Sequence, residues 1–186
     1  VTVLVPDGVT GNIQVAAIAP VLGGSQGTVR VNQGGTLRLP TGAQGALEAF
    51  VGETDDARLN LTEGYVLFDI GQRKVTLTAG SEGTIPEGKE FNLLMNTAIG
   101  NEYRVGLTAA IEAGATLTAI GTLNIPSLDN DTGTGDNAGC LVVRGTVEAS
   151  TGTLDLGHYA TVTVEDGGTL DLEPAYTGSL PSIVLT

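Results

Sequence analysis

Short apolar–polar–apolar triplets recur along the chain and are separated by glycine-rich segments. Clear examples are Val29–Val31, Leu59–Leu61 and Val162–Val164. Side chains alternate between the two faces of a β-strand, so each triplet predicts a short strand with one buried face. Glycine allows the backbone to turn sharply between two such strands. The pattern therefore predicts an all-β chain of short strands joined by tight corners.

Two stretches of the chain are near copies of each other. They read "GTVRVNQGGTLRL" at 27–39 and "ATVTVEDGGTLDL" at 160–172, and they agree at the apolar and glycine positions while the polar positions between them differ. Looser copies lie at 74–86, 108–119 and 145–156. Because the inward positions agree and the outward ones vary, we interpret the unit as structural rather than catalytic.

The glycine pair in the middle of the unit predicts a specific backbone conformation. We expect the first glycine of each pair to have a positive φ, at Gly34 and Gly167, with Gly114 in the copy at 108–119. On this basis Gly167→Val should destabilise the fold more than Gly168→Ala, because a β-branched residue is strained at positive φ. The leucines that follow the corners are expected to stack at one inward position in successive coils; they are Leu37, Leu117, Leu154 and Leu170.

Strands this short favour stacked parallel coils over hairpins, with each strand pairing with the one a coil away. The unequal but recurrent spacing of the copies favours a solenoid with inserted loops, for which we expect coils of about 20 residues. We expect one domain over 1–186, with a first coil or N-terminal cap at 1–26, repeated coils at 27–172, and a C-terminal cap or the start of a linker at 173–186. Residues 90–100 fit either a two-turn helix or a strand with a loop.

The recurring pattern xVxVxxGGTLxL, over about residues 27–172, resembles the right-handed parallel β-helix of bacterial surface and autotransporter passenger-type proteins, in the broad pectin-lyase-like group. The resemblance implies an all-β, single-domain parallel β-helix, or β-solenoid, in an extracellular or bacterial cell-surface location. Such helices serve as adhesins, stalks and polysaccharide-active enzymes, so the fold alone leaves the function open.

Composition narrows the classes of partner. The chain has 8 Lys and Arg against 21 Asp and Glu, a net charge of −13, which argues against binding nucleic acid or an anionic membrane surface. No apolar run is long enough for membrane insertion of this segment. Gly contributes 28 of 186 residues and aromatic residues only 4%, which suits thin stacked layers. The single cysteine, Cys140, lies in the apolar run "GCLVV" and is expected to be buried.

An enzymatic interpretation depends on Asp55, Asp56 and His158. Polygalacturonase-like β-helix hydrolases use clustered aspartates with a Gly-His pair, and paired carboxylates can divide into a general acid and a general base. However, the aspartates lie far before His158 in the sequence, and no Lys or Arg follows Arg144 to supply the basic motif. A solvated loop at 55–56 is the competing interpretation.

The most polar segment, "LDNDTGTGDNAG" at 128–139, could supply oxygen ligands for calcium through Asp129, Asp131 and Asp136. It lacks the EF-hand spacing, because Cys140 stands where a bidentate Glu is required. The alternative is a surface loop without a metal, and no other cofactor is expected.

Tyr159, beside His158, is the best candidate for a sugar-binding platform, and the favoured alternative is a tyrosine that only covers the edge of a coil. Two functions follow. The first is a non-enzymatic, extracellular structural or adhesive module that presents a rigid acidic surface to a host or cell-surface protein or to a glycan. The alternative is a polysaccharide lyase or glycoside hydrolase that uses acidic loop residues.

Overall fold

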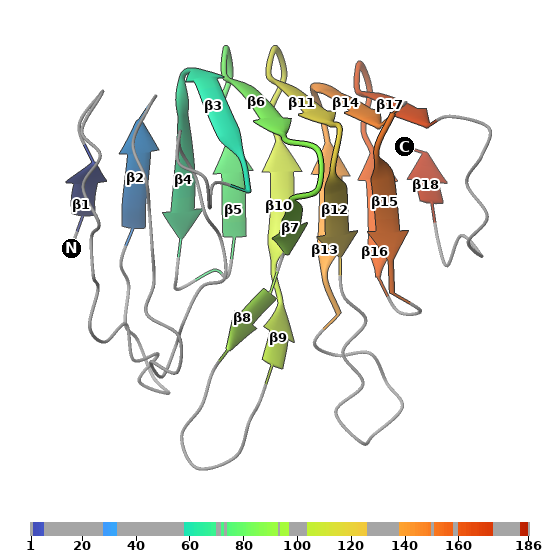
Figure 1. Ribbon diagram of the computed structural model, residues 1–186, viewed down its shortest axis with the longest axis horizontal. Helices are drawn as coiled ribbons and strands as arrows, with labels where there is room; N and C mark the ends of the chain where they lie inside the picture. The colour runs from blue at the N-terminus through green and yellow to red at the C-terminus, as the bar shows by residue number, and fades with distance from the viewer. Residues whose placement is uncertain are drawn as a thin grey trace.

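The structure is a computed structural model that describes residues 2–5, 28–32, 58–69, 72, 74–92, 94–96, 104–125, 138–149, 151–157, 160–172 and 183–185. Within these ranges the protein is all-β, with no helix (Figure 1). Residues 90–92 and 94–96 are strands, which confirms the strand interpretation there. Accordingly, the described ranges include no helix of the length and apolarity needed to cross a membrane.

The described strands form four sheets. The first sheet has the order β1 (Thr2–Val5), β2 (Thr28–Asn32), β4 (Tyr65–Asp69), β5 (Lys74–Leu77), β10 (Thr108–Ile111), β13 (Cys140–Val143), β16 (Thr161–Val164) and β18 (Ile183–Leu185). The second sheet has the order β17 (Thr169–Leu172), β14 (Thr146–Ala149), β11 (Thr116–Ala119), β6 (Glu82–Ile85) and β3 (Asn60–Glu63). The third contains β15 (Thr153–Leu156), β12 (Thr122–Ile125) and β7 (Glu90–Asn92), and the fourth pairs β8 (Leu94–Asn96) with β9 (Arg104–Gly106).

From β5 to β17 the chain visits the first three sheets in turn, with β8 and β9 inserted in the first pass, and corresponding strands of successive passes pair in parallel. This confirms the predicted pairing between neighbouring passes. The predicted coil length fits the pass from Cys140 to its partner Thr161, but it is too short for the two passes before it, in which Lys74 pairs with Thr108 and Thr108 with Cys140. The extra residues lie between a third-sheet strand and the next first-sheet strand, at 93–107 and 126–139.

Parallel pairing does not extend to every described strand. β3 runs antiparallel to β6, and β4 runs antiparallel to both β5 and β2, so residues 60–69 cross two sheets in the reverse direction. The fully buried Ser81 holds this reversed segment at its corner, since its hydroxyl accepts from the Tyr65 backbone N–H at 3.0 Å and donates to the Tyr65 carbonyl at 3.2 Å. Predicted parallel pairing is therefore wrong here and at β8–β9.

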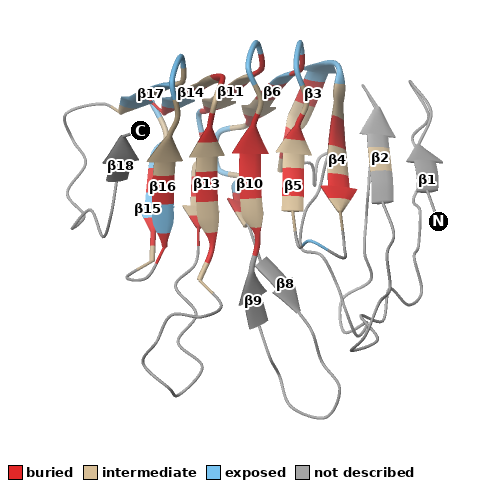
Figure 2. Cartoon of the chain, turned by 180° about the vertical axis from the view of Figure 1, so that it is seen from behind, coloured by how far each residue is buried: buried red, intermediate tan, exposed pale blue. Residues whose placement is uncertain are grey.

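The core lies between the first three sheets. Along most of the strands from β4 to β17 whose burial is described, buried residues alternate with half-buried or exposed ones, whereas β10 is buried over Ala109, Ala110 and Ile111 (Figure 2). The largest fully buried side chains include Leu61 and Phe68 in the reversed segment, with Ile85, Leu123 and Leu141 in the parallel passes. This confirms the face assignment of the triplets at 59–61, 154–156 and 162–164, although Val164 is only partly buried.

The predicted leucine stack is correct for two members and wrong for a third. Leu117 and Leu170 share one inward register in the second sheet, with Val147 between them. Leu154 instead pairs with Leu123 in the third sheet, because the identical strings at 152–156 and 168–172 follow different corners of the pass. Leu37 lies outside the described residues.

The corner glycines have the predicted conformation. Gly114 has a φ of 77° and Gly167 a φ of 82°, while Gly34 lies outside the described residues. Both corners close with a backbone hydrogen bond, such as the 2.8 Å bond from the Gly168 N–H to the Glu165 carbonyl. The predicted ranking of the two substitutions is not supported. A Cβ at Gly167 would meet nothing within 4 Å, whereas one at Gly168 would overlap the Val143 carbonyl oxygen.

Cys140 is half-buried rather than buried. The inward positions of β13 belong to Leu141 and Val143, both with 0% exposure, so strand alternation places the thiol on the outer side of the first sheet together with Val142. The sequence-based expectation failed because an apolar run does not reveal which alternate set of residues faces inward.

Candidate interaction surface

The residues proposed from the sequence for catalysis, calcium or sugar binding cannot be compared with the structure. All of them lie outside the described residues: Asp55, Asp56, Asp129, Asp131, Asp136, His158 and Tyr159. The hydrolase, calcium and sugar-platform hypotheses therefore stay predictions.

The part of the chain that is described offers neither a metal centre nor a polar pocket in the core. It contains no group of three or more His, Cys, Asp or Glu side chains placed to hold a metal ion. A cavity of about 20 Å³ lies among apolar side chains of all three sheets, including Leu59, Val75 and Phe91. Its volume is about that of one water molecule, and its lining offers no titratable group. Among the described residues, the candidate functional groups are therefore those on the outer faces of the sheets.

The outer face of the second sheet carries two in-register rows of polar side chains. We use "row" for outward residues that are register partners on neighbouring strands. Every outward residue of β6, β11, β14 and β17 is a threonine or an acid, and Glu82, Glu148 and Asp171 are exposed. The first row is Glu82, Thr116, Thr146 and Thr169, and the second is Thr84, Thr118, Glu148 and Asp171.

The third sheet continues this polar surface. Its outward rows are Glu90, Thr122 and Thr153, and then Asn92, Asn124 and Asp155. The Asn124 side-chain Nδ2 donates to Glu90 Oε1 at 2.7 Å, which joins the two rows across neighbouring strands.

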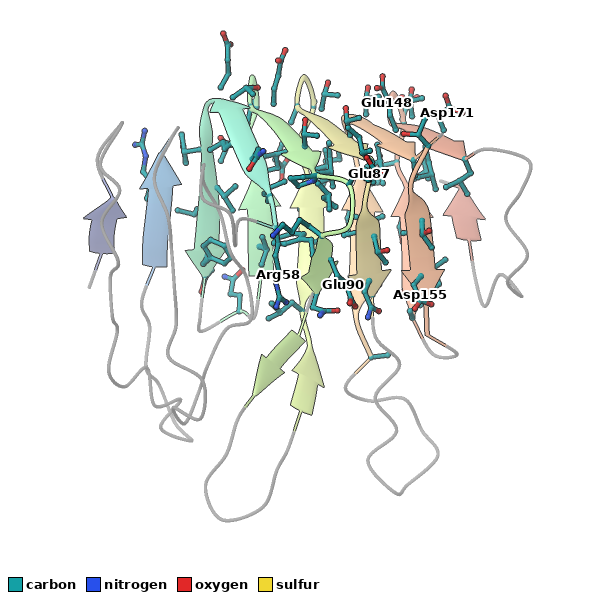
Figure 3. The ribbon with its side chains drawn as sticks, viewed as in Figure 1. Arg58, Glu87, Glu90, Glu148, Asp155 and Asp171 are labelled. Atoms are coloured by element: carbon teal, nitrogen blue, oxygen red, sulfur yellow. The ribbon has the colours of Figure 1, made fainter. Side chains whose placement is uncertain are left out.

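Together we call the outer sides of the second and third sheets the acidic faces. Most of their strands begin with a threonine after a corner, which suits a residue that favours strands through its branched Cβ. The carboxylates follow at set positions in the same strands, so the backbone ladders fix their spacing. Figure 3 shows five acidic side chains of these two sheets and of the corner between them: Glu87, Glu90, Glu148, Asp155 and Asp171.

Two carboxylates of the second sheet stand directly opposite each other. Glu148 of β14 and Asp171 of β17 are register partners, and both side chains are exposed. Like charges at opposed positions of neighbouring strands destabilise a sheet. Thr118 Oγ1 donates to Glu148 Oε2 at 3.4 Å, which is a long hydrogen bond to one member of the pair. A cation placed over Glu148 and Asp171 would therefore relieve a repulsion built into the sheet.

Arg144 occupies a different arrangement, at the corner after β13. Its Nε donates to Glu165 Oε2 at 2.6 Å and its Nη2 to Glu165 Oε1 at 2.8 Å, while Nη1 lies 3.1 Å from Glu112 Oε1. The hydrogen bond to Glu165 is the main cause that raises the pKa of Arg144. Side chains of three successive passes are thus tied together, which serves the packing of corners rather than a ligand.

Sequence reasoning identified the outward positions but missed their arrangement in rows. The available signal was the middle residue of each triplet: Asp155 and Asp171 occupy the same place in two copies of Thr-Leu-Asp-Leu. Which carboxylates become neighbours depends on strand pairing between passes of unequal length.

Compared with known proteins, this chain shows no significant match to a family model, a curated protein or a solved structure.

Proposed function

We propose that this chain is a single-domain parallel β-solenoid that works as a rigid, non-enzymatic module at a bacterial cell surface. The proposal is supported by three sheets in which the passes from β5 onward pair strand on strand in parallel. The resemblance of the xVxVxxGGTLxL unit to surface and passenger-type β-helices favours the same conclusion. A net charge of −13 suits a protein that stays soluble outside the cell.

The acidic faces are the surface that this module presents. The observation that carries the proposal is the opposed pair of exposed carboxylates, Glu148 and Asp171, on a regular sheet. A partner with cationic groups gains from both charges without reordering the backbone that holds them. Basic patches of a host or cell-surface protein and the amino groups of a glycan supply the same chemistry.

Binding measurements on the immobilised chain test this proposal. The probes are a basic globular protein, a partly deacetylated amino-sugar oligomer, and a neutral oligosaccharide as the negative control. The double variant Glu148→Gln/Asp171→Asn should weaken binding of a cationic probe about tenfold. The matched control, Glu87→Gln/Asp166→Asn, removes the same two charges from exposed corner positions and should change binding much less. Equal losses from both double variants would show diffuse attraction and would contradict the proposed surface.

The enzymatic alternative predicts a different result. Incubation with uronic-acid polymers, with and without calcium, should release no shortened products if the module is non-enzymatic. Depolymerisation that is lost in Asp55→Asn or His158→Ala would instead establish the polysaccharide-active function.

A further inference from the structure

The outer face of the first sheet is partly apolar, whereas the described outer faces of the second and third sheets are polar. Its central row is Leu67, Thr76, Ala110, Val142 and Thr163, by the registers of β4, β5, β10, β13 and β16. Three of these five outward residues are apolar, whereas every described outward residue of the second and third sheets is polar. A sheet with one solvated face normally alternates apolar inward and polar outward, so this row makes the outer face of the first sheet less polar than the outer faces of the other two.

The charges on this face nearly cancel. Among the described outward residues of β4, β5, β10, β13 and β16, the charged ones are Asp69 and Lys74, which are register partners on neighbouring strands. At the β2 side, the Arg30 guanidinium stacks 3.8 Å above the ring of Tyr65. We call the outer side of these five strands the neutral face; Figure 2 looks onto it.

The side chains of the neutral face are small and closely packed. Ala110, in the middle of the central row, has 0% exposure although it points to the outer side, and its row neighbours Thr76 and Val142 are half-buried. Such a surface loses little side-chain entropy when another flat surface packs on it. Small, half-buried side chains on neighbouring strands suit packing against a second sheet.

We propose that the neutral face packs against the same face of a second copy of this chain. The argument for this occupant is the distribution of charge. Each copy carries a net charge of −13, almost none of which comes from the neutral face. Two copies that meet through it keep their acidic faces apart, whereas any contact through the acidic faces would place carboxylates opposite carboxylates. The contact is isologous, with the two sheets about 10 Å apart.

The area of the neutral face determines how strong a dimer is expected. The five strands of the neutral face, spaced by about 4.8 Å, give a width of about 20 Å, and strands of four or five residues add a length of about 13 Å. Each copy would then bury about 260 Å², so the total lies below that of stable specific interfaces and fits a transient contact. We therefore expect a weak dimer that forms at high micromolar to millimolar concentration. This inference does not depend on the function proposed for the acidic faces, because it concerns the first sheet, whose outer side is nearly neutral.

Sedimentation equilibrium of the full chain across this concentration range tests the proposal. We expect reversible dimerisation that strengthens as salt screens the repulsion between the two copies. Val142→Glu should abolish it, and Thr163→Glu provides a second variant if the first fails to fold. The matched control, Thr118→Glu, adds the same charge to the second sheet and should leave dimerisation unchanged. A chain that stays monomeric at millimolar concentration and high salt would overturn the proposal, and so would equal effects of Val142→Glu and Thr118→Glu.

The unmodified chain provides a second readout through Cys140, which lies half-buried on the neutral face. Its rate of reaction with a maleimide should fall as protein concentration rises, because the dimer covers the thiol. The control variant Cys140→Ser/Thr118→Cys moves the thiol to an acidic face, where the rate should not depend on concentration. A concentration-independent rate for Cys140 in the unmodified chain would refute the face-to-face contact.

Discussion

Replacing Gly121 by alanine tests how closely successive corners of the chain approach one another. Gly121 ends the short corner between β11 and β12 and lies on the corner of the preceding pass, between β6 and β7. A Cβ at this position would come within 3.0 Å of the carbonyl oxygens of both Pro86 and Lys89, a distance that real Cβ atoms essentially never show. Both oxygens belong to the backbone, so neither can turn aside as a flexible side chain would.

The cost follows from what must move to admit the methyl group. The N–H groups of Ile120 and Gly121 both donate to the Ile85 carbonyl at 2.9 Å, and the Thr122 N–H donates to the Lys89 carbonyl at 2.9 Å. Displacing the corner strains or breaks these bonds, at about 1 kcal/mol each. Overpacking in a close-packed region adds about 1–3 kcal/mol. We therefore expect Gly121→Ala to lower the free energy of unfolding by about 4–6 kcal/mol.

Gly88 is the matched control, because it lies in the corner beneath Gly121 and is required for a different reason. Its φ is 71° and a Cβ there would meet nothing within 4 Å, so Gly88→Ala adds only the strain of a left-handed alanine, about 1–2 kcal/mol. Urea unfolding followed by circular dichroism measures both variants, and an unchanged m-value confirms that the comparison is of stability alone. If Gly121→Ala destabilises no more than Gly88→Ala, the close contact between corners does not exist and the reasoning is refuted.

Three further predictions concern the core, a buried hydroxyl and the corner cation. Leu123→Ala, at a position with 1% exposure, should cost about 2–5 kcal/mol in urea unfolding, and the partly buried Leu170→Ala should cost less than half of this. Ser81→Ala should cost about 1–3 kcal/mol in the same assay, because it leaves the partly buried Tyr65 N–H without its acceptor; a loss below about 0.5 kcal/mol would mean that water replaces the hydroxyl. Arg144→Gln should lower the thermal midpoint slightly at neutral pH, since the site is a third exposed. The raised pKa of Arg144 means that its contribution persists through neutral and moderately alkaline pH and is lost only as pH rises through the folded-state pKa, so a loss near neutral pH would contradict this account.

The sequence was sufficient to predict which residues of the acidic faces point outward, but not how those residues are grouped. The outward positions could be identified from the triplets, because the polar residue between two inward residues has only one place to point. Their grouping into rows, including the Glu148–Asp171 pair, required the strand registers. The separation of acidic faces from a neutral face required them too, since Val142 and Asp155 occupy equivalent places in their own triplets but lie on different sheets.

Local rules determined the elements of this protein. Strand alternation identified the inward residues at 59–61 and 154–156, and the steric freedom of glycine identified the positive φ at Gly114 and Gly167. These properties involve neighbouring residues only, so a few letters of sequence encode them.

Tertiary structure decided which elements meet. The two copies of Gly-Thr-Leu-Asp-Leu are identical in sequence, yet Leu154 belongs to the third sheet and Leu170 to the second. Residues 60–69 form ordinary short strands that run in reverse, held by contacts with Ser81 in a later segment. The length of each pass likewise depends on how many residues separate a strand of the third sheet from the next strand of the first sheet. Pairing between strands that lie a whole pass apart is set by the packing of the entire core, and no local pattern of apolar and polar residues contains that information.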